Sequence, residues 1–421
     1  MVFETFSSAQ AYLLWATFAL AVVLGAVVNK TNFCTMGAVS DWVNMGDTGR
    51  LRSWLFAIAV AILGVVGLEY FGLVEPDQAF PPYRAGQLVW AENLLGGILF
   101  GIGMTLASGC GNKILIRVGG GNLKSVMVVL VIAVIAYFMV NPFPNSDKTL
   151  FTMFFYDWLR PLAVNLKGGQ DLGTLIAGSE NAVTARLAIG AALGLFLLVM
   201  VFKSVDFRSR VDNVLGGLVV GLAVLGAWYV TSNLNIGLDG EQYSLREYAQ
   251  QWDFLADSSE GKPADTRPLS PQSFTFINPM GQTLGYASER LNPAYLTFGI
   301  MSLFGVVVGS FLWALVSRSF KFEWFASFRD FLTHFFGAAL MGFGGVLAMG
   351  CTIGQGVTGI STLALGSFVA FGGIVLGSAL TMKVQYYRMV YEDEASFGSA
   401  LVAALVDFRL LPKGMRRLAA V

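Results

Sequence analysis

The chain has 421 residues, of which 55% are hydrophobic and only 13% are charged, and its formal net charge is zero. A soluble domain carries about 25% charged residues, so this composition excludes both a cytosolic enzyme and a disordered chain. The balance of 27 basic and 27 acidic residues gives no indication of nucleic-acid binding. Long apolar runs recur throughout and predict a polytopic membrane protein whose surroundings are the lipid bilayer.

The chain carries few residues for metal or proton-transfer chemistry. It has three cysteines, Cys34, Cys110 and Cys351, and a single histidine, His334. An odd number of cysteines without a CxxC pair argues against a disulfide framework and a zinc site, so we expect no metal and no cofactor. His334 opens an apolar segment, and we expect a helix-end or packing residue there. Glycine is abundant, at 49 residues, and this excess needs a cause.

Nine apolar segments indicate membrane-spanning helices. The first has an acidic residue and no basic residue before its apolar run, which argues against a cleaved signal peptide. The segments cover roughly residues 11–28, 53–74, 94–106, 126–140, 185–202, 214–230, 294–316, 331–347 and 365–382.

Basic residues gather in every second connection. Lys30, Arg50 and Arg52 follow the first segment, and similar clusters follow the third, fifth, seventh and ninth. Because cytoplasmic loops carry the excess of Lys and Arg, this pattern predicts an extracytoplasmic N-terminus and a cytoplasmic C-terminus. The chain then divides into a first membrane half (1–140), an extracytoplasmic connection (141–184), the start of a second membrane half (185–230), an extracytoplasmic loop (231–293), the rest of the second half (294–382) and a cytoplasmic tail (383–421).

The two long extracytoplasmic connections differ in character. The first contains an aromatic stretch at 151–164, which suits a helix lying at the membrane interface. The second is polar over 245–268 and predicts a small cap or a partly ordered loop.

An internal repeat relates the third and eighth segments. Gly96, Gly101, Gly103, Leu106, Ala107, Gly109 and Cys110 match Gly337, Gly342, Gly344, Leu347, Ala348, Gly350 and Cys351 at one constant offset. The two segments are expected to cross the membrane in opposite directions, an arrangement common in secondary transporters. The sequence therefore predicts an all-α fold of about nine transmembrane helices with two pseudo-symmetric inverted halves.

Both repeat segments are short for a full span. Each offers about 15 residues where about 20 are needed, and each ends in a Gly-Cys turn. We therefore expect half-helices that continue into short re-entrant helices, which are tolerated where they line a cavity or are buried in protein. Other glycines have a simpler role. Ten of them form GxxxG pairs that let helices approach closely, at 97/101, 190/194, 217/221, 305/309 and 373/377, and we expect most of the glycine excess to serve packing.

The three cysteines open stretches that are rich in small and polar residues. Backbone N–H groups and the helix that follows each cysteine favour an anion. A thiol is soft and a weak donor, so neutral thiols suit a sulfur atom better than an oxygen. The candidate ligands beside Cys34, Cys110 and Cys351 are Gly109, Asn112, Lys113, Gly350, Thr352 and Gln355. A buried cysteine is also often only a small apolar residue, and Asn112, Thr352 and Gln355 are equally suited to helix capping.

Two charged residues need a separate explanation. Lys113 follows Cys110 and is suited to attract an anion or to clamp a phosphate-like group, but the excess of basic residues in cytoplasmic loops is the simpler explanation. Glu69 lies near the outer end of the second segment. Proton coupling is the functional interpretation for such an acid, whereas its nearness to the interface favours snorkelling.

Three stretches of the sequence resemble one known family. They are Phe33-Cys34-Thr35-Met36-Gly37-Ala38 with Asp41, Ser108-Gly109-Cys110 with Arg117-Val118-Gly119, and Met349-Gly350-Cys351-Thr352-Ile353-Gly354-Gln355-Gly356. They resemble the YeeE/YedE family of inner-membrane transporters of thiosulfate and related sulfur compounds. The resemblance implies an hourglass-like helical body in the bacterial inner membrane. It also implies that Cys34, Cys110 and Cys351 line a central path and pass thiosulfate by S–H···S hydrogen bonds.

The expected function is uptake of thiosulfate or a related small sulfur anion by a transporter that is not an enzyme, with a cytoplasmic sulfur-carrier protein as a candidate partner. The alternatives are a membrane sulfur-relay component that forms a cysteine persulfide and a channel for another small anion. No base or resolving cysteine supports the persulfide alternative. The chain departs from the family at Gly111-Asn112-Lys113 and in its long external loops, so sulfite, sulfide and a selenium analogue also stay open as substrates.

Overall fold

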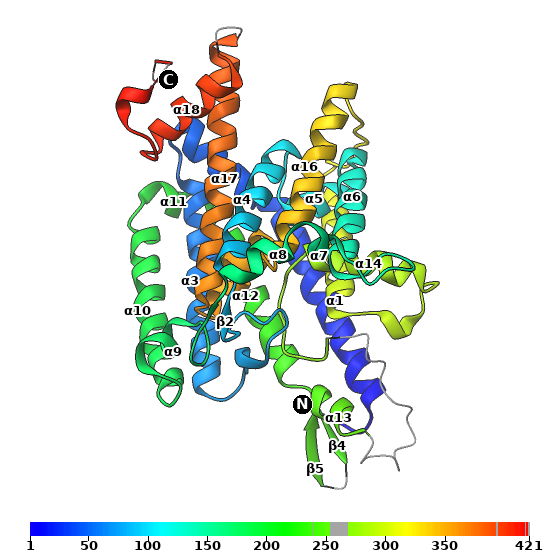
Figure 1. The fold of residues 1–421 in the computed structure, drawn as a ribbon. Coiled ribbons are helices and arrows are strands. Elements are labelled where there is room, and N and C mark those ends of the chain that lie inside the picture. The colour runs from blue at the N-terminus through cyan, green and yellow to red at the C-terminus, as the bar shows by residue number, and fades with distance from the viewer. Residues whose placement is uncertain (239, 253–267, 393–394, 417, 420–421) are drawn as a thin grey trace.

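The described part of the protein is mainly helical. A computed structural model describes residues 1–238, 240–252, 268–392, 395–416 and 418–419. Within those residues, nine helical stretches are long and apolar enough to cross a membrane, which confirms the predicted segments. The two termini lie at opposite ends of the molecule (Figure 1). Residues 253–267 of the predicted cap and residues 393–394, 417 and 420–421 of the predicted tail lie outside the described residues.

The long helices are α1 (Phe6–Thr31), α3 (Gly49–Tyr70), α4 (Trp90–Leu106), α6 (Leu123–Val140), α10 (Ala182–Phe202), α12 (Val211–Ser232), α15 (Phe298–Val316), α16 (Phe328–Leu347) and α17 (Leu365–Val390). Three short helical pieces continue interrupted helices: α2 (Thr35–Ser40) with the π-helix η1 (Asp41–Met45), α5 (Gly111–Gly119), and the π-helix η6 (Gly354–Gly359).

The connections contain the remaining elements. The short α-helices are α7 (Leu150–Phe154), α8 (Tyr156–Leu159), α9 (Leu172–Ala177), α11 (Val205–Ser209), α13 (Leu245–Gln250), α14 (Ile277–Ser288) and α18 (Phe397–Asp407). The 3₁₀ turns are η2 (Pro76–Gln78), η3 (Arg160–Leu162), η5 (Pro293–Tyr295) and η8 (Lys413–Met415). The strands are β1 (Val2–Phe3), β2 (Gln87–Leu88), β3 (Val164–Asn165), β4 (Asn235–Leu238) and β5 (Glu241–Ser244).

The strands make two small sheets outside the helical body. In the first, β4 pairs in parallel with β1 and antiparallel with β5, in the order β1-β4-β5. In the second, β2 pairs antiparallel with β3. The first sheet and α13 lie at the end of the molecule that carries the N-terminus (Figure 1).

Helices α4, α16 and α17 form a tightly packed centre (Figure 1). The antiparallel pair α4 and α16 meets at glycines. A Cβ on Gly103 would lie 2.6 Å from the carbonyl oxygen of Gly337, and a Cβ on Gly344 would lie 2.6 Å from that of Gly96. No side chain fits between backbones at that separation, so glycine is what permits this contact.

The GxxxG pairs named above serve the same purpose. Gly97 and Gly101 face α17, and Gly373 and Gly377 of α17 face α4 in return. The other three pairs bring α10 and α12 against α3 and bring α15 against α1. The prediction that these GxxxG pairs serve helix packing is confirmed.

Helices α4 and α16 are longer than the sequence predicted. They hold 17 and 20 residues, because each begins several residues earlier than its apolar run. Polar residues such as Glu92 and Asp330 lie in these first turns, where an acid stabilises the helix dipole. Ser327 also caps α16 by accepting a hydrogen bond from the Asp330 backbone N–H. Their C-terminal ends, at Leu106 and Leu347, do stop just before the Gly-Cys turns.

The second long connection is not only a surface loop. Its residues 272–276 are buried and lie outside any helix or strand, and α14 then packs against α6. The Ser273 hydroxyl donates to the carbonyl of Val224 in α12 at 2.8 Å, and the Thr358 hydroxyl donates to the carbonyl of Phe274 at 2.8 Å. The Thr358 bond satisfies a backbone carbonyl of the buried segment, and the Ser273 bond satisfies a buried side-chain hydroxyl. The sequence reading of 231–293 as a cap or loop therefore missed a part of the protein core.

The close contact of α4 with α16 makes a direct prediction. Gly103→Ala places a methyl group against the Gly337 carbonyl, and overpacking of this kind costs about 1–3 kcal/mol. We expect a lower midpoint of thermal denaturation for the purified variant in detergent. Gly372→Ala in α17 is the matched control, because a Cβ there meets no atom within 4 Å. An unchanged midpoint for Gly103→Ala would contradict the close backbone approach.

Candidate functional site

Each of the three cysteines follows a helix that ends inside the protein. Two residues before each cysteine, the backbone adopts a left-handed conformation, with φ of 51° at Asn32, 57° at Ser108 and 55° at Met349. This conformation is uncommon outside glycine and terminates an α-helix. A new helical piece then begins directly after each cysteine. The three thiols therefore share one kind of local structure, a break between two helical pieces.

The two Gly-Cys turns share their hydrogen bonds as well. The N–H of Gly109 donates to the carbonyl of Met104 at 2.9 Å, and the N–H of Gly350 donates to the carbonyl of Gly345 at 2.8 Å. This is the six-residue closure of a Schellman motif. Phe33 replaces the glycine before Cys34, yet the left-handed residue is retained there. The Gly-Cys repeat of the sequence therefore does not include Cys34, although its local backbone conformation is the same.

The structure brings the three cysteines into one buried cluster. The thiols of Cys34 and Cys110 are in side-chain contact with each other. Cys110 also faces the side chain of Thr352, which follows Cys351. A Cβ on Gly111 would lie 3.6 Å from the Cβ of Cys351, so the two Gly-Cys turns touch. Residues from the first and second membrane halves therefore meet at the points where their helices are interrupted.

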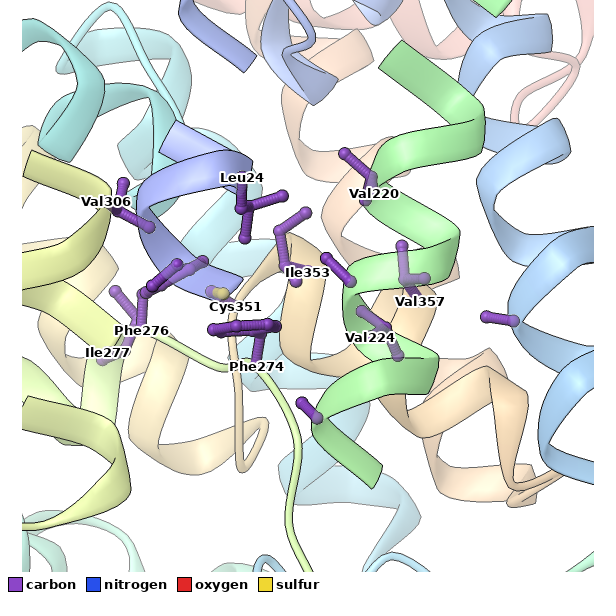
Figure 2. Close-up of a cluster of buried hydrophobic side chains, with 14 of the residues drawn as sticks. Leu24, Val220, Val224, Phe274, Phe276, Ile277, Val306, Cys351, Ile353 and Val357 are labelled. Carbon is purple, nitrogen blue, oxygen red and sulfur yellow. The ribbon is translucent and has the colours of Figure 1, made fainter. Parts of the chain in front are cut away.

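Cys351 lies in a more apolar environment than the other two. Figure 2 shows its sulfur among Phe274, Phe276 and Ile353. The Gly354 N–H donates to its sulfur at 3.4 Å, and the Thr275 side chain faces the thiol. The buried segment 272–276 therefore forms one wall of the thiol cluster.

Several polar atoms around the thiols are buried without a hydrogen-bond partner among the described residues. They include the hydroxyls of Thr35, Thr275 and Thr352 and the side-chain oxygen of Asn112. Nearly all buried polar groups in folded proteins are hydrogen-bonded, so a group of orphans needs a reason. The absence of partners is explained if these polar groups are left free to bind a ligand.

The remaining predicted ligands support the turns rather than facing the thiols. The Gln355 amide nitrogen donates to the Ala348 carbonyl, so this side chain braces the turn around Cys351. A Cβ on Gly350 would lie 3.3 Å from Cγ of Gln355, and a Cβ on Gly109 would lie 3.5 Å from side-chain atoms of Lys113 and Ile114.

Lys113 is half-buried beside the thiol cluster rather than in an exposed loop. It lies in the first turn of α5, and its ammonium donates to the side-chain oxygen of Asn32 at 2.9 Å. It interacts electrostatically with both Cys34 and Cys110.

Glu69 does not snorkel toward the interface, as its position near a helix end had suggested. Its carboxylate is buried, accepts two hydrogen bonds from Arg84 at 2.6 and 2.8 Å, and accepts a third from Arg186 at 2.7 Å. Arg186 also pairs with Asp171, and Arg84 donates to the carbonyl of Thr362 at 2.8 Å. This charge cluster fixes the end of the segment that follows Cys351.

His334 has a packing role, as expected. Its ring contacts Phe325 edge to face, and its Nδ1 lies 2.9 Å from the carbonyl oxygen of Asp330 on the preceding helical turn.

Sequence reasoning missed three residues near the thiols. For Thr35 the sequence offers a clue, since a Cys-Thr pair recurs at 34–35 and 351–352. For Thr275 the sequence offers no clue, because this residue lies 76 residues from Cys351 in a polar connection. For Tyr83 the sequence offers no clue either. Its hydroxyl is buried without a partner among the described residues, and burial together with the nearby Cys351 raises the pKa of Tyr83.

Comparison with known proteins identifies the family of this chain. A family model described as "Sulphur transport" matches residues 30–380, so the chain belongs to this family. The match includes all three helix breaks. The chain is 22% identical over 384 residues to the thiosulfate transporter TsuA of Escherichia coli strain K12, covering 87% of this chain and 93% of that protein. It is 21% identical over 381 residues to the thiosulfate transporter TsuA of Spirochaeta thermophila, covering 87% and 97%.

The charge cluster around Asp171 predicts a specific acid sensitivity. Burial disfavours ionisation of Asp171, but hydrogen bonds from Arg186 and Thr174 outweigh burial and hold its pKa at about 2, below its ordinary value of 3.8. Its stabilising contribution is therefore complete above about pH 4 and is lost as the pH falls toward 2. We expect Asp171→Asn to lower the free energy of unfolding at pH 7 by up to about 3 kcal/mol. The loss is limited because Arg186 retains its ion pair with Glu69.

Thermal denaturation in detergent between pH 7 and pH 3 measures this effect. The difference between wild type and Asp171→Asn should shrink at the acid end of that range. Below about pH 4 the unfolded chain takes up a proton at Asp171, whereas the folded protein, in which the pKa is about 2, still holds an ionised carboxylate. Glu180→Gln, at an exposed carboxylate shortly before α10, is the matched control and should not alter the curve. A variant as stable as wild type at pH 7 would refute the stabilising role of the pair.

Proposed function

We propose that this protein takes up thiosulfate, or a related small sulfur anion, through a path lined by the thiols of Cys34, Cys110 and Cys351. The observation that carries the proposal is the meeting of three helix breaks at one buried thiol cluster. The names of the two TsuA relatives support thiosulfate as the substrate. The protein acts as a transporter rather than an enzyme.

Neutral thiols explain why a sulfur anion passes through this cluster. A thiolate would repel an anion, whereas an S–H group donates a weak hydrogen bond to a soft acceptor such as the terminal sulfur of thiosulfate. Weak donors in series allow the anion to bind and also to leave. The free hydroxyls of Thr35 and Thr352 then serve the sulfonate oxygens, which are harder acceptors.

The route has a direction in this proposal. Cys351 lies near Tyr83, which belongs to a connection at the end of the molecule with the N-terminus (Figure 1). Cys34 and Cys110 lie near Lys113. With the N-terminus outside and the C-terminus in the cytoplasm of a bacterial inner membrane, an incoming anion meets Cys351 first. A cytoplasmic sulfur-carrier protein is a suitable recipient at the other end.

An inverted relation between the two halves is part of the same proposal. It is supported by the matching turns at Cys110 and Cys351 and by the crossing of α4 and α16. In that crossing, Gly96 meets Gly344 and Gly103 meets Gly337, so each contact joins an early repeat position to a late one. Two copies of one element that approach a shared point from opposite sides suit alternating access.

The proposal predicts that single thiol substitutions stop transport. We expect Cys110→Ala and Cys351→Ala to reduce uptake of radiolabelled thiosulfate by proteoliposomes to background, because each removes a donor from an obligatory path. Both variants should also fail to support thiosulfate-dependent growth while still inserting in the membrane. Ser302→Ala, at a small buried residue of α15, is the control that should transport like wild type.

Three outcomes separate the alternatives. Wild-type uptake by either alanine variant would overturn the thiol path. Flux that survives Cys→Ser changes at all three positions would favour a channel that does not use the thiols. A cysteine that gains one sulfur atom while sulfite is released, detected by mass measurement, would favour a persulfide relay.

A further inference from the structure

The ammonium of Lys113 is a cation beside the thiol cluster whose hydrogen-bond partner is neutral. It donates to the Asn32 side-chain oxygen at 2.9 Å, and it makes no ion pair within the described residues. The side chain is half-buried. A partly buried charge without a counter-charge is unfavourable, so a position of this kind calls for an anion.

The neighbouring cations are already committed to other groups. Arg50 forms a two-point ion pair with Asp41, with 2.6 Å between Nη2 and Oδ1. Arg117 donates to the carbonyl of Ser108 at 2.7 Å and thereby holds the turn before Cys110. Neither Arg117 nor Lys113 forms an ion pair among the described residues, but the Arg117 guanidinium is engaged in holding the turn, and Lys113 is the cation that lies close to both Cys34 and Cys110.

The groups around the Cys34–Cys110 pair separate into two chemical kinds. The two thiols are soft. The Thr35 and Thr352 hydroxyls, each buried to more than nine-tenths and without a partner among the described residues, are hard donors, as is the Lys113 ammonium. Thiosulfate is divided in the same way, with a soft terminal sulfur at one end and three hard oxygens at the other.

We propose that Lys113 supplies the counter-charge for the second negative charge of a dianion held at the Cys34–Cys110 pair, with Thr35 and Thr352 binding the same sulfonate end. This assignment rests on the proposed function and specifies its substrate class as a sulfur dianion. Neutral thiols and hydroxyls alone leave two negative charges uncompensated in a buried place, which is costly. Lys113 therefore favours an anion that carries two negative charges, while the thiols favour an anion that has a soft sulfur atom.

Two anions of similar shape test the assignment. Thiosulfate carries two negative charges, whereas the methanethiosulfonate anion keeps the terminal sulfur and carries one. We expect Lys113→Met to raise the KM of thiosulfate uptake in proteoliposomes by about ten-fold or more, as the loss of a charge-assisted contact does. The concentration of methanethiosulfonate that halves uptake should change several-fold less. Lys113→Arg, which keeps the charge, should restore most of the affinity.

A second variant tests the role of Lys113 without replacing this lysine. Asn32→Asp gives Lys113 a carboxylate partner and retains a residue type that tolerates the left-handed backbone at φ 51°. It should also raise the KM for thiosulfate, so the assignment stays testable if Lys113→Met does not fold. Lys30→Met is the matched control, because this lysine is exposed in the last turn of α1 and lies over Trp313.

The outcomes distinguish this assignment from the proposed function. An unchanged KM in Lys113→Met, or an equal loss of affinity for both anions, would overturn the role of Lys113 while thiosulfate uptake by the wild type persists. Absence of thiosulfate uptake by the wild type itself would instead refute the proposed function.

Discussion

Three helices of this protein stop inside the molecule, and the rest of the structure is arranged around those ends. A helix end leaves backbone N–H and C=O groups without intrahelical partners, and a membrane interior offers no water to satisfy them. Each break must therefore be covered by protein or used by a ligand. Left-handed residues at Asn32, Ser108 and Met349 set where the breaks fall, and a cysteine follows each one.

Covering the breaks requires close packing, and glycine provides it. The backbones of α4 and α16 approach so closely at Gly103 and Gly337 that no Cβ fits between them. This contact brings Cys110 and Cys351 to the same place from opposite ends of the molecule. The buried segment 272–276 closes the cluster beside Cys351, and the ion pairs of Glu69 fix the chain that follows it. On the proposed route an anion moves past thiols that are all buried, so segments around the cluster must move during transport.

The sequence predicted the parts of this site that local chemistry determines. Apolar runs located nine spans, and the repeated Gly-Cys turn identified Cys110 and Cys351, because both features depend on neighbouring residues. Contacts between distant segments were not predictable in this way. Glu69 has the sequence position of an interfacial acid, because its partners Arg84 and Arg186 lie in other segments, 15 and 117 residues away. Thr275 lies in a polar connection, and nothing in its surroundings indicates that the chain there enters the core. In the sequence, Lys113 has the pattern of a basic residue in a cytoplasmic loop, and only the structure shows that it lies beside Cys34.

The central claim is that thiols receive the soft end of a sulfur anion. The most direct measurement is an experimental structure with selenosulfate, in which selenium replaces the terminal sulfur of thiosulfate and can be located by anomalous scattering. We expect a selenium peak within hydrogen-bonding distance of one of the thiols of Cys34, Cys110 and Cys351, with the oxygens turned toward hydroxyls or Lys113. A selenium peak away from all three thiols, or a sulfonate group turned toward them, would contradict it.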